Sequence, residues 1–163
     1  MSVKNYENLG IHLMNIMDRL MTNDNLVNLL YYTDSDPLNN PPLSVEEKRA
    51  MVYEKLIKIV PHVGTKETAQ SVLAIRVESA RGDDENGEFK NIIIKIDVIV
   101  PLTQWIIRST NLRPFLILGE VQKSLNGKRF ESVGKMYGGD FELNFLTDEV
   151  CGYEQTFYLL NYE

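Results

Sequence analysis

The sequence predicts an α+β fold, in which N-terminal helices pack on a mainly antiparallel sheet with a long β-hairpin and one further helix. Two observations support this fold class. Apolar residues recur at helical spacing in the first third of the chain. From residue 71 onward, several segments alternate between apolar and polar residues, which is typical of strands with one buried face. The 163 residues fit a single domain, residues 1–163, and no linker or internal repeat divides them.

Three helices are expected before the sheet. Residues 5–22 are amphipathic, with Met17 and Leu20 on the apolar side and His12 on the polar side. Asp24 is placed to cap a short second helix. The loop 33–43 that follows is irregular and rich in proline. Ser44 and Glu47 form an S-x-x-E capping box that opens a third helix. Its expected apolar face consists of Val45, Val52, Leu56 and Ile59.

A long hairpin is expected next. Residues 71–79 alternate as a half-buried strand, and residues 81–88 form a polar, glycine-containing tip. The chain returns through the apolar run FKNIIIKIDVIV, which ends at a proline. Even-numbered residues from 92 to 100 share one face of this strand, and Ile93, Lys95, Asp97 and Ile99 share the other.

The remaining segments predict a helix and three strands. Pro114 is suited to the first turn of a helix over residues 114–126, and Gly127 to its C-terminal cap. Strands are expected at residues 128–137, 140–146 and 152–163, with a hairpin turn at residues 134–140. The inward-facing residues of the second of these strands are expected to be Phe141, Leu143 and Phe145.

Composition and charge limit the kinds of function that this chain is expected to have. The net charge is −6, the pI is near 5.0 and no Lys/Arg-rich run occurs, so a broad nucleic-acid footprint is not expected. The single cysteine cannot form an internal disulfide, which suits a reducing compartment or a particle assembled inside the cell. The first residues lack a signal-peptide pattern, and the apolar runs are too short to span a membrane.

One enzyme hypothesis arises from Asp97, Glu120 and Lys123. A metal-dependent nuclease can hold Mg²⁺ with an aspartate on one strand and a Glu-x-Lys motif on the next. Here two residues separate Glu120 from Lys123, and the segment is predicted to be helical. A surface ion pair between positions i and i+3 is therefore favoured, and Asp97 is expected to be a structural or interface residue.

The other candidates favour structural roles. His12 and His62 have no cluster of further ligands, so neither predicts a zinc site. Cys151 has no evident histidine partner for nucleophilic catalysis. Trp105 and the tyrosines could stack nucleobases, but the acidic charge favours packing roles. We expect no catalytic residue, no cofactor and no metal.

The order of features over residues 60–163 resembles a family of phage proteins. A long IIIKIDVIV strand precedes WII…RPFLILGEVQKSLNG, a glycine-containing hairpin and LTDEVCGYEQTFYLLNY. This layout resembles the small neck and tail-completion proteins of tailed bacteriophages, in particular the tail-terminator type. That family consists of α+β subunits and has no catalytic residues to carry over. The first 50 residues, including the proline-rich loop, are not part of the resemblance.

The resemblance implies a virion structural protein that is assembled in the host cytoplasm. It would form a ring, typically a hexamer, that caps the tail tube and joins it to the connector. Its partners would be further copies of itself and the tail-tube and connector proteins. DNA would pass through the ring without specific binding, and no membrane would be involved. A head-completion or baseplate component is the alternative structural role.

The hairpin is the expected docking element. Its tip combines acidic and basic side chains, which suits a rim contact with a charged partner surface. Apolar side chains on its mixed face could be buried by a neighbouring subunit. The predicted interface residues are Arg81, Asp83, Asp84, Glu85, Glu88, Ile93, Asp97 and Ile99.

Overall fold

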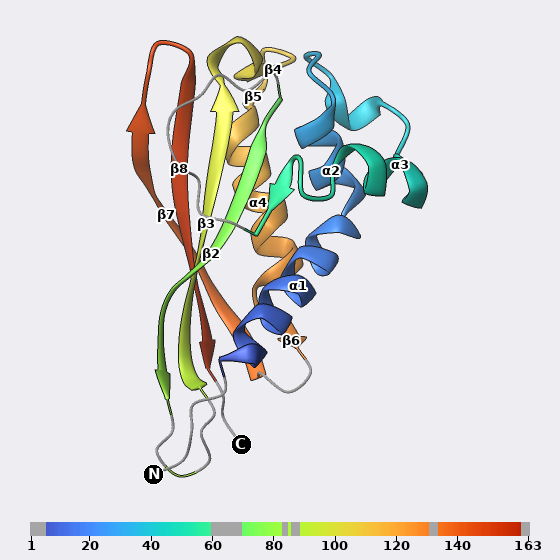
Figure 1. The fold of residues 1–163 in the computed structure, drawn as a ribbon. Coiled ribbons are helices and arrows are strands. Elements are labelled where there is room, and N and C mark those ends of the chain that lie inside the picture. Colours follow the sequence, from blue (N-terminus) through green and yellow to red (C-terminus); the bar gives the residue numbers. More distant parts are fainter. Residues whose placement is uncertain (1–5, 60–69, 83–84, 86–88, 131–133, 161–163) are drawn as a thin grey trace.

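A sheet and a helical layer make up the chain, and the helices cover only one face of the sheet (Figure 1). This computed structural model describes residues 6–59, 70–82, 85, 89–130 and 134–160. The predicted α+β class is confirmed, with the helices at the N-terminus and a mainly antiparallel sheet. None of the described helices is long and apolar enough to span a membrane.

The N-terminal helices are α1 (Glu7–Met21), α2 (Asp24–Tyr31) and α3 (Val45–Met51), with a 3₁₀ turn at Pro37–Asn39. Asn23, and not Asp24, caps α2: its side chain accepts a 3.0 Å hydrogen bond from the Leu26 backbone N–H. The predicted capping box of α3 is present, since Ser44 and Glu47 each accept the other's backbone N–H.

Helix α3 is shorter than the sequence pattern predicts, and it ends at Met51. Val45 is 67% exposed, so the expected apolar face does not include it. Val52 and Leu56 are buried, but they lie in a turn that leads into the short strand β1 (Ile57–Lys58). The apolar spacing at residues 45–59 therefore comes from helix α3 followed by a turn and strand β1, and not from one longer helix.

The main sheet has the strand order β1-β2-β3-β8-β7-β6. Strand β1 runs parallel to β2, and every other neighbouring pair is antiparallel. The predicted hairpin is formed by the long strands β2 and β3. A separate small sheet contains β4 and β5, which lead into helix α4. The bounds of the remaining elements are β2 (Val72–Gly82), β3 (Phe89–Pro101), β4 (Ile106–Ile107), β5 (Asn111–Leu112), α4 (Arg113–Leu125), β6 (Arg129–Phe130), β7 (Gly134–Leu146) and β8 (Val150–Leu160).

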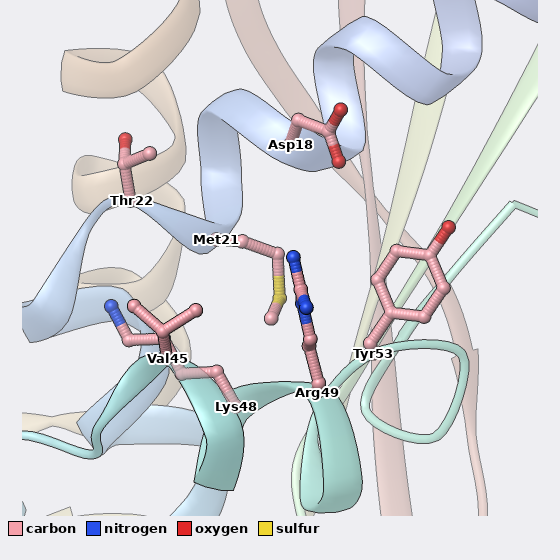
Figure 2. Close-up of a pocket in the computed structure, with 7 residues that line it drawn as sticks. All are labelled: Asp18, Met21, Thr22, Val45, Lys48, Arg49 and Tyr53. Atoms are coloured by element: carbon pink, nitrogen blue, oxygen red, sulfur yellow. The ribbon is translucent and has the colours of Figure 1, made fainter.

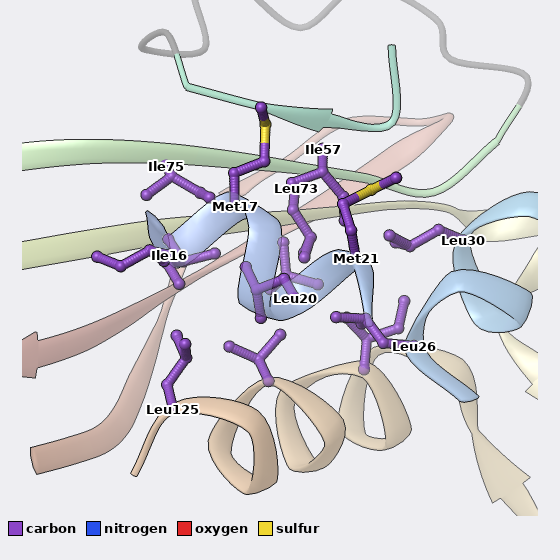
Figure 3. Close-up of a cluster of buried hydrophobic side chains, with 14 of the residues drawn as sticks. Ile16, Met17, Leu20, Met21, Leu26, Leu30, Ile57, Leu73, Ile75 and Leu125 are labelled. Atoms are coloured by element: carbon purple, nitrogen blue, oxygen red, sulfur yellow. The ribbon is translucent and has the colours of Figure 1, made fainter. Parts of the chain in front are cut away.

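The core lies between the helices and one face of the sheet (Figure 3). Ile16 and Leu20 of α1 pack towards Leu73 and Ile75 of β2 and towards Leu125 of α4. His12 of α1 is also buried, although the helical pattern placed it on the polar side.

Strand β7 continues through the glycines that the sequence analysis assigned to a hairpin turn. Its pairing with β8 shifts register between Gly138 and Asp140, which is a β-bulge. Gly138 has a φ of +131°, and Gly139 has a φ of +115°. The bulge is fastened to α4, because the Gln122 side-chain amide donates to the Gly138 carbonyl. A hairpin turn and a β-bulge both use glycines with positive φ. The glycines alone could not distinguish the two, and the predicted turn was wrong.

Gly138→Ala is expected to lower the free energy of unfolding by about 2–4 kcal/mol, measured by urea denaturation. An added Cβ would lie 2.5 Å from the backbone oxygen of Thr156, at a φ that L side chains rarely adopt. Gly119→Ala in α4 is the matched control. Its Cβ meets no atom within 4 Å, so it should raise stability by up to about 1 kcal/mol. Equal effects of both substitutions would contradict the role of the bulge.

Candidate interaction surface

A charge cluster lies on the sheet face opposite the helices. It is formed by Arg76 of β2, Lys95 and Asp97 of β3, and Glu154 of β8, which occupy adjacent positions in register. The Arg76 guanidinium donates to Asp97, and also to Glu154 at 2.5 Å. Lys95 donates to Glu154 at 2.6 Å, and the Asn144 amide donates to Asp97 at 3.2 Å. Asp97 is therefore buried and paired within its own chain.

The nuclease arrangement does not form. Asp97 lies on the open face of the sheet, whereas Glu120 belongs to α4 on the opposite face. Glu120 instead pairs with Lys123 at 3.1 Å, in the predicted i,i+3 arrangement, and accepts a 3.1 Å hydrogen bond from Asn23. Among the described residues, no three His, Cys, Asp or Glu side chains converge to hold a metal ion.

The structure places two of the remaining candidate side chains, Cys151 and Trp105, within the packed part of the chain. Burial raises the pKa of the Cys151 thiol, which keeps it protonated and a poor nucleophile near neutral pH. Trp105 is half-buried, and its ring centroid lies 6.3 Å from that of Tyr153, so it takes part in packing. His62 lies outside the described residues.

The charge cluster also determines the ionisation of its members. Burial raises the pKa of Glu154, but hydrogen bonds from Lys95 and Arg76 outweigh burial and hold the pKa below its ordinary value. Conversely, the hydrogen bond to Glu154 raises the pKa of Lys95. The carboxylate of Glu154 is therefore more stable as an anion in the folded chain than in the unfolded chain.

This shift predicts a loss of stability in acid. Since the folded-state pKa of Glu154 is below its ordinary value of 4.5, the stabilisation is present above that pH and is lost as the pH falls through the lower pKa. The urea midpoint should decrease between about pH 5 and pH 3. Glu154→Gln removes this titration, so the variant should show a shallower decrease over the same range. An unchanged slope in the variant would contradict the assignment.

An apolar edge cluster is exposed on the helix side of the sheet. It consists of Phe115 at the start of α4 and Phe141, Leu143 and Leu146 of β7. The ring of Phe141 lies 5.8 Å from that of Phe115 and 5.5 Å from that of Tyr153, so the aromatic side chains form one packed group. Even so, Phe141 is 48% exposed and Leu143 is 56% exposed. Contiguous exposed apolar side chains of this kind mark interaction surfaces.

The sequence analysis expected Phe141 and Leu143 to face inward, and this was wrong. Their register with Gln155 and Tyr153 places both on the helix-covered side of the sheet, but β7 is close to the sheet edge and both side chains remain exposed there. Alternation separates the two faces of a strand and cannot tell how far the helical layer extends. The side chain of Phe145 lies outside the described residues.

The hairpin residues divide into three groups. Arg81 and Glu85 are exposed, as a docking role requires. Asp83, Asp84 and Glu88 lie outside the described residues. On the mixed face, Ile93 is half-buried, whereas Ile99 is fully buried beside Val72 and Gly152, so Ile99 is not available to a partner.

A groove of about 500 Å³ lies between the end of α1 and helix α3 (Figure 2). Met21, Val45 and Tyr53 line it with apolar atoms, and Arg49 extends between Met21 and Tyr53. Lys48 on its rim is paired with Asp24 at 2.6 Å. None of the α3 residues is fully buried, and the helix contacts the core through the partly buried side chain of Met51.

Comparison with known proteins gives one family. The family model described as YomW matches residues 23–157, which span α2 to β8 and include the charge cluster and the apolar edge cluster. No curated protein matches the chain.

Proposed function

The chain belongs to the YomW family, a phage-associated family whose name derives from a Bacillus phage protein, and from this premise we propose that it is a virion structural protein of a tailed phage. It forms a ring, a hexamer, at the head–tail junction. The ring caps the tail tube and joins it to the connector, while DNA passes through without specific binding. The protein acts by contact, with no cofactor and no reaction.

The apolar edge cluster carries this proposal. A side chain such as Phe141 or Leu143 gains free energy only when a partner removes it from water, at roughly 25 cal/mol per Å² of apolar area. The net charge of −6 also supports the proposal, because an acidic ring repels the DNA that moves through it. A structural role therefore accounts for the exposed apolar edge cluster and for the negative net charge.

Quantitative mass spectrometry of purified phage particles tests the proposal. We expect about six copies per particle, as a six-fold cyclic ring requires, and immunogold label at the junction of head and tail. Phage that lack the protein should yield separate heads and tails. Label at the baseplate, or a copy number that no ring accommodates, would overturn the proposal.

A further inference from the structure

We propose that neighbouring copies join by strand addition: the free edge of β7 in one copy pairs with the free edge of β2 in the next. This inference rests on the proposed ring and specifies the surfaces that close it. It assigns opposite edges of the sheet to the two sides of one contact, so every copy uses both edges.

Both edges offer backbone groups for pairing. Strand β6 pairs with β7 only at Gly134 and Lys135, and β1 pairs with β2 only at Leu73 and Ala74. In the described part of the chain, residues 140–146 of β7 and residues 75–82 of β2 therefore have no outer neighbour strand. Exposed edges of this length readily pair with another strand.

Strand directions suit this junction. The pairs β2–β3, β3–β8 and β8–β7 are all antiparallel, so β7 runs opposite to β2. When a second copy is placed beside the first, its β2 lies antiparallel to the first copy's β7. Within one sheet Asp140 is level with Arg76, because both align with the pair Lys95 and Thr156. The two free segments therefore meet when the second copy is also displaced along the strands by about five residues, roughly 17 Å. The alternation of the sheet then continues across the junction, and a head-to-tail contact of this kind closes into a ring.

Charge distinguishes this junction from a two-fold contact. Asp140 and Glu142 of β7 are exposed, and their register with Thr156 and Glu154 places them on the open face of the sheet. Pairing β7 with a second β7 would bring these carboxylates against each other, which is destabilising. On β2, Arg81 is exposed and lies on the same face. Glu78 on the same edge is paired with Arg76 at 3.4 Å, so Arg81 is the cation that the displaced pairing brings beside Asp140.

The same contact covers the apolar edge cluster. Helix α1 packs on β2, so strand addition brings the helical layer of the next copy beside β7. That layer lies on the same side of the sheet as Phe115 and Phe141. The second copy then buries the exposed rings. The same contact pairs the backbone groups of the β7 edge.

Cysteine cross-linking in assembled particles tests the junction. Ser79→Cys on β2 and Asp140→Cys on β7 place one thiol at each edge on the open face, in a Cys151→Ala background that removes the native thiol. A short bis-maleimide tolerates small differences in register. The double variant should give a ladder of linked copies, and each single variant should give only monomer. Asp140→Cys combined with Glu46→Cys on exposed α3 is the matched control and should give no ladder.

The outcomes separate this inference from the proposed function. Dimers from Asp140→Cys alone would replace the head-to-tail junction with a two-fold contact. Absence of a ladder from the double variant, in particles that still hold a ring's number of copies, would overturn the junction and leave the ring intact. A wild-type copy number that no ring accommodates would overturn the proposed function, whatever the cross-links show.

Discussion

Arg113→Met is expected to lower the free energy of unfolding by about 3–5 kcal/mol, one of the two largest effects predicted for this chain. Arg113 is fully buried at the start of α4. Its guanidinium donates to four backbone carbonyls, which belong to Leu29, Tyr32, Asp34 and Gln104 at 2.5–2.9 Å. The Leu29 carbonyl is at the C-terminal end of α2, where helix carbonyls lack partners and a cation is favourable.

Methionine fills much of the arginine volume and donates no hydrogen bond, so the substitution isolates the loss of the four contacts. Arg108→Met is the matched control. Arg108, between β4 and β5, is paired with Asp36 of the loop that follows α2, but the Arg108 side chain is 57% exposed. A pair of this kind contributes at most about 1 kcal/mol. Urea denaturation of both variants measures the difference, and similar losses would contradict the anchoring role of Arg113.

Arg76→Met is expected to lower the free energy of unfolding by about 2–4 kcal/mol. The substitution removes the cation shared by Asp97 and Glu154. Within the described residues, the buried Asp97 carboxylate then keeps the hydrogen bond from the Asn144 amide alone. Breaking a buried pair from one side is costly, because the remaining charge stays desolvated. Lys95→Met should cost less, since Glu154 keeps its contact with Arg76.

A double-mutant cycle makes this prediction quantitative. Arg76→Met combined with Asp97→Asn removes both charges of the pair, so the double variant should be more stable than the sum of the two single losses implies. Chemical denaturation near neutral pH gives the four values. Strict additivity would show that Arg76 and Asp97 do not interact in the folded chain.

Local patterns predicted the elements whose signals are contained in a few neighbouring residues. The alternation in β2 and β3 and the capping box of Ser44 and Glu47 are signals of this kind. The bulge at Gly138 was mistaken for a turn because both structures need a positive φ, and only the partner strand distinguishes them. The strand at residues 140–146 was predicted, but a register shift between Leu143 and Phe145 interrupts its alternation, and its exposure depends on how far the helical layer extends over β7.

The candidate site was predictable only in part, for a similar reason. Position in β3 placed Asp97 on the mixed face, but its burial depends on Arg76 and Glu154 from two other strands. Arg113 carried no signal in the sequence, since its acceptors are backbone carbonyls that any residue could supply. Side-chain patterns reveal the faces of an element and cannot reveal contacts to the backbone of a distant segment.

The contact between Arg113 and α2 has a consequence for the order in which the chain folds during its synthesis. The arginine reaches the Leu29 carbonyl across a separation of 84 positions. Helix α2 leaves the ribosome long before its anchor is translated, so the nascent N-terminal helices remain only locally stabilised until α4 emerges. A ribosome-bound fragment that ends before residue 113 should therefore be sensitive to protease, and one that extends through β8 should be protected.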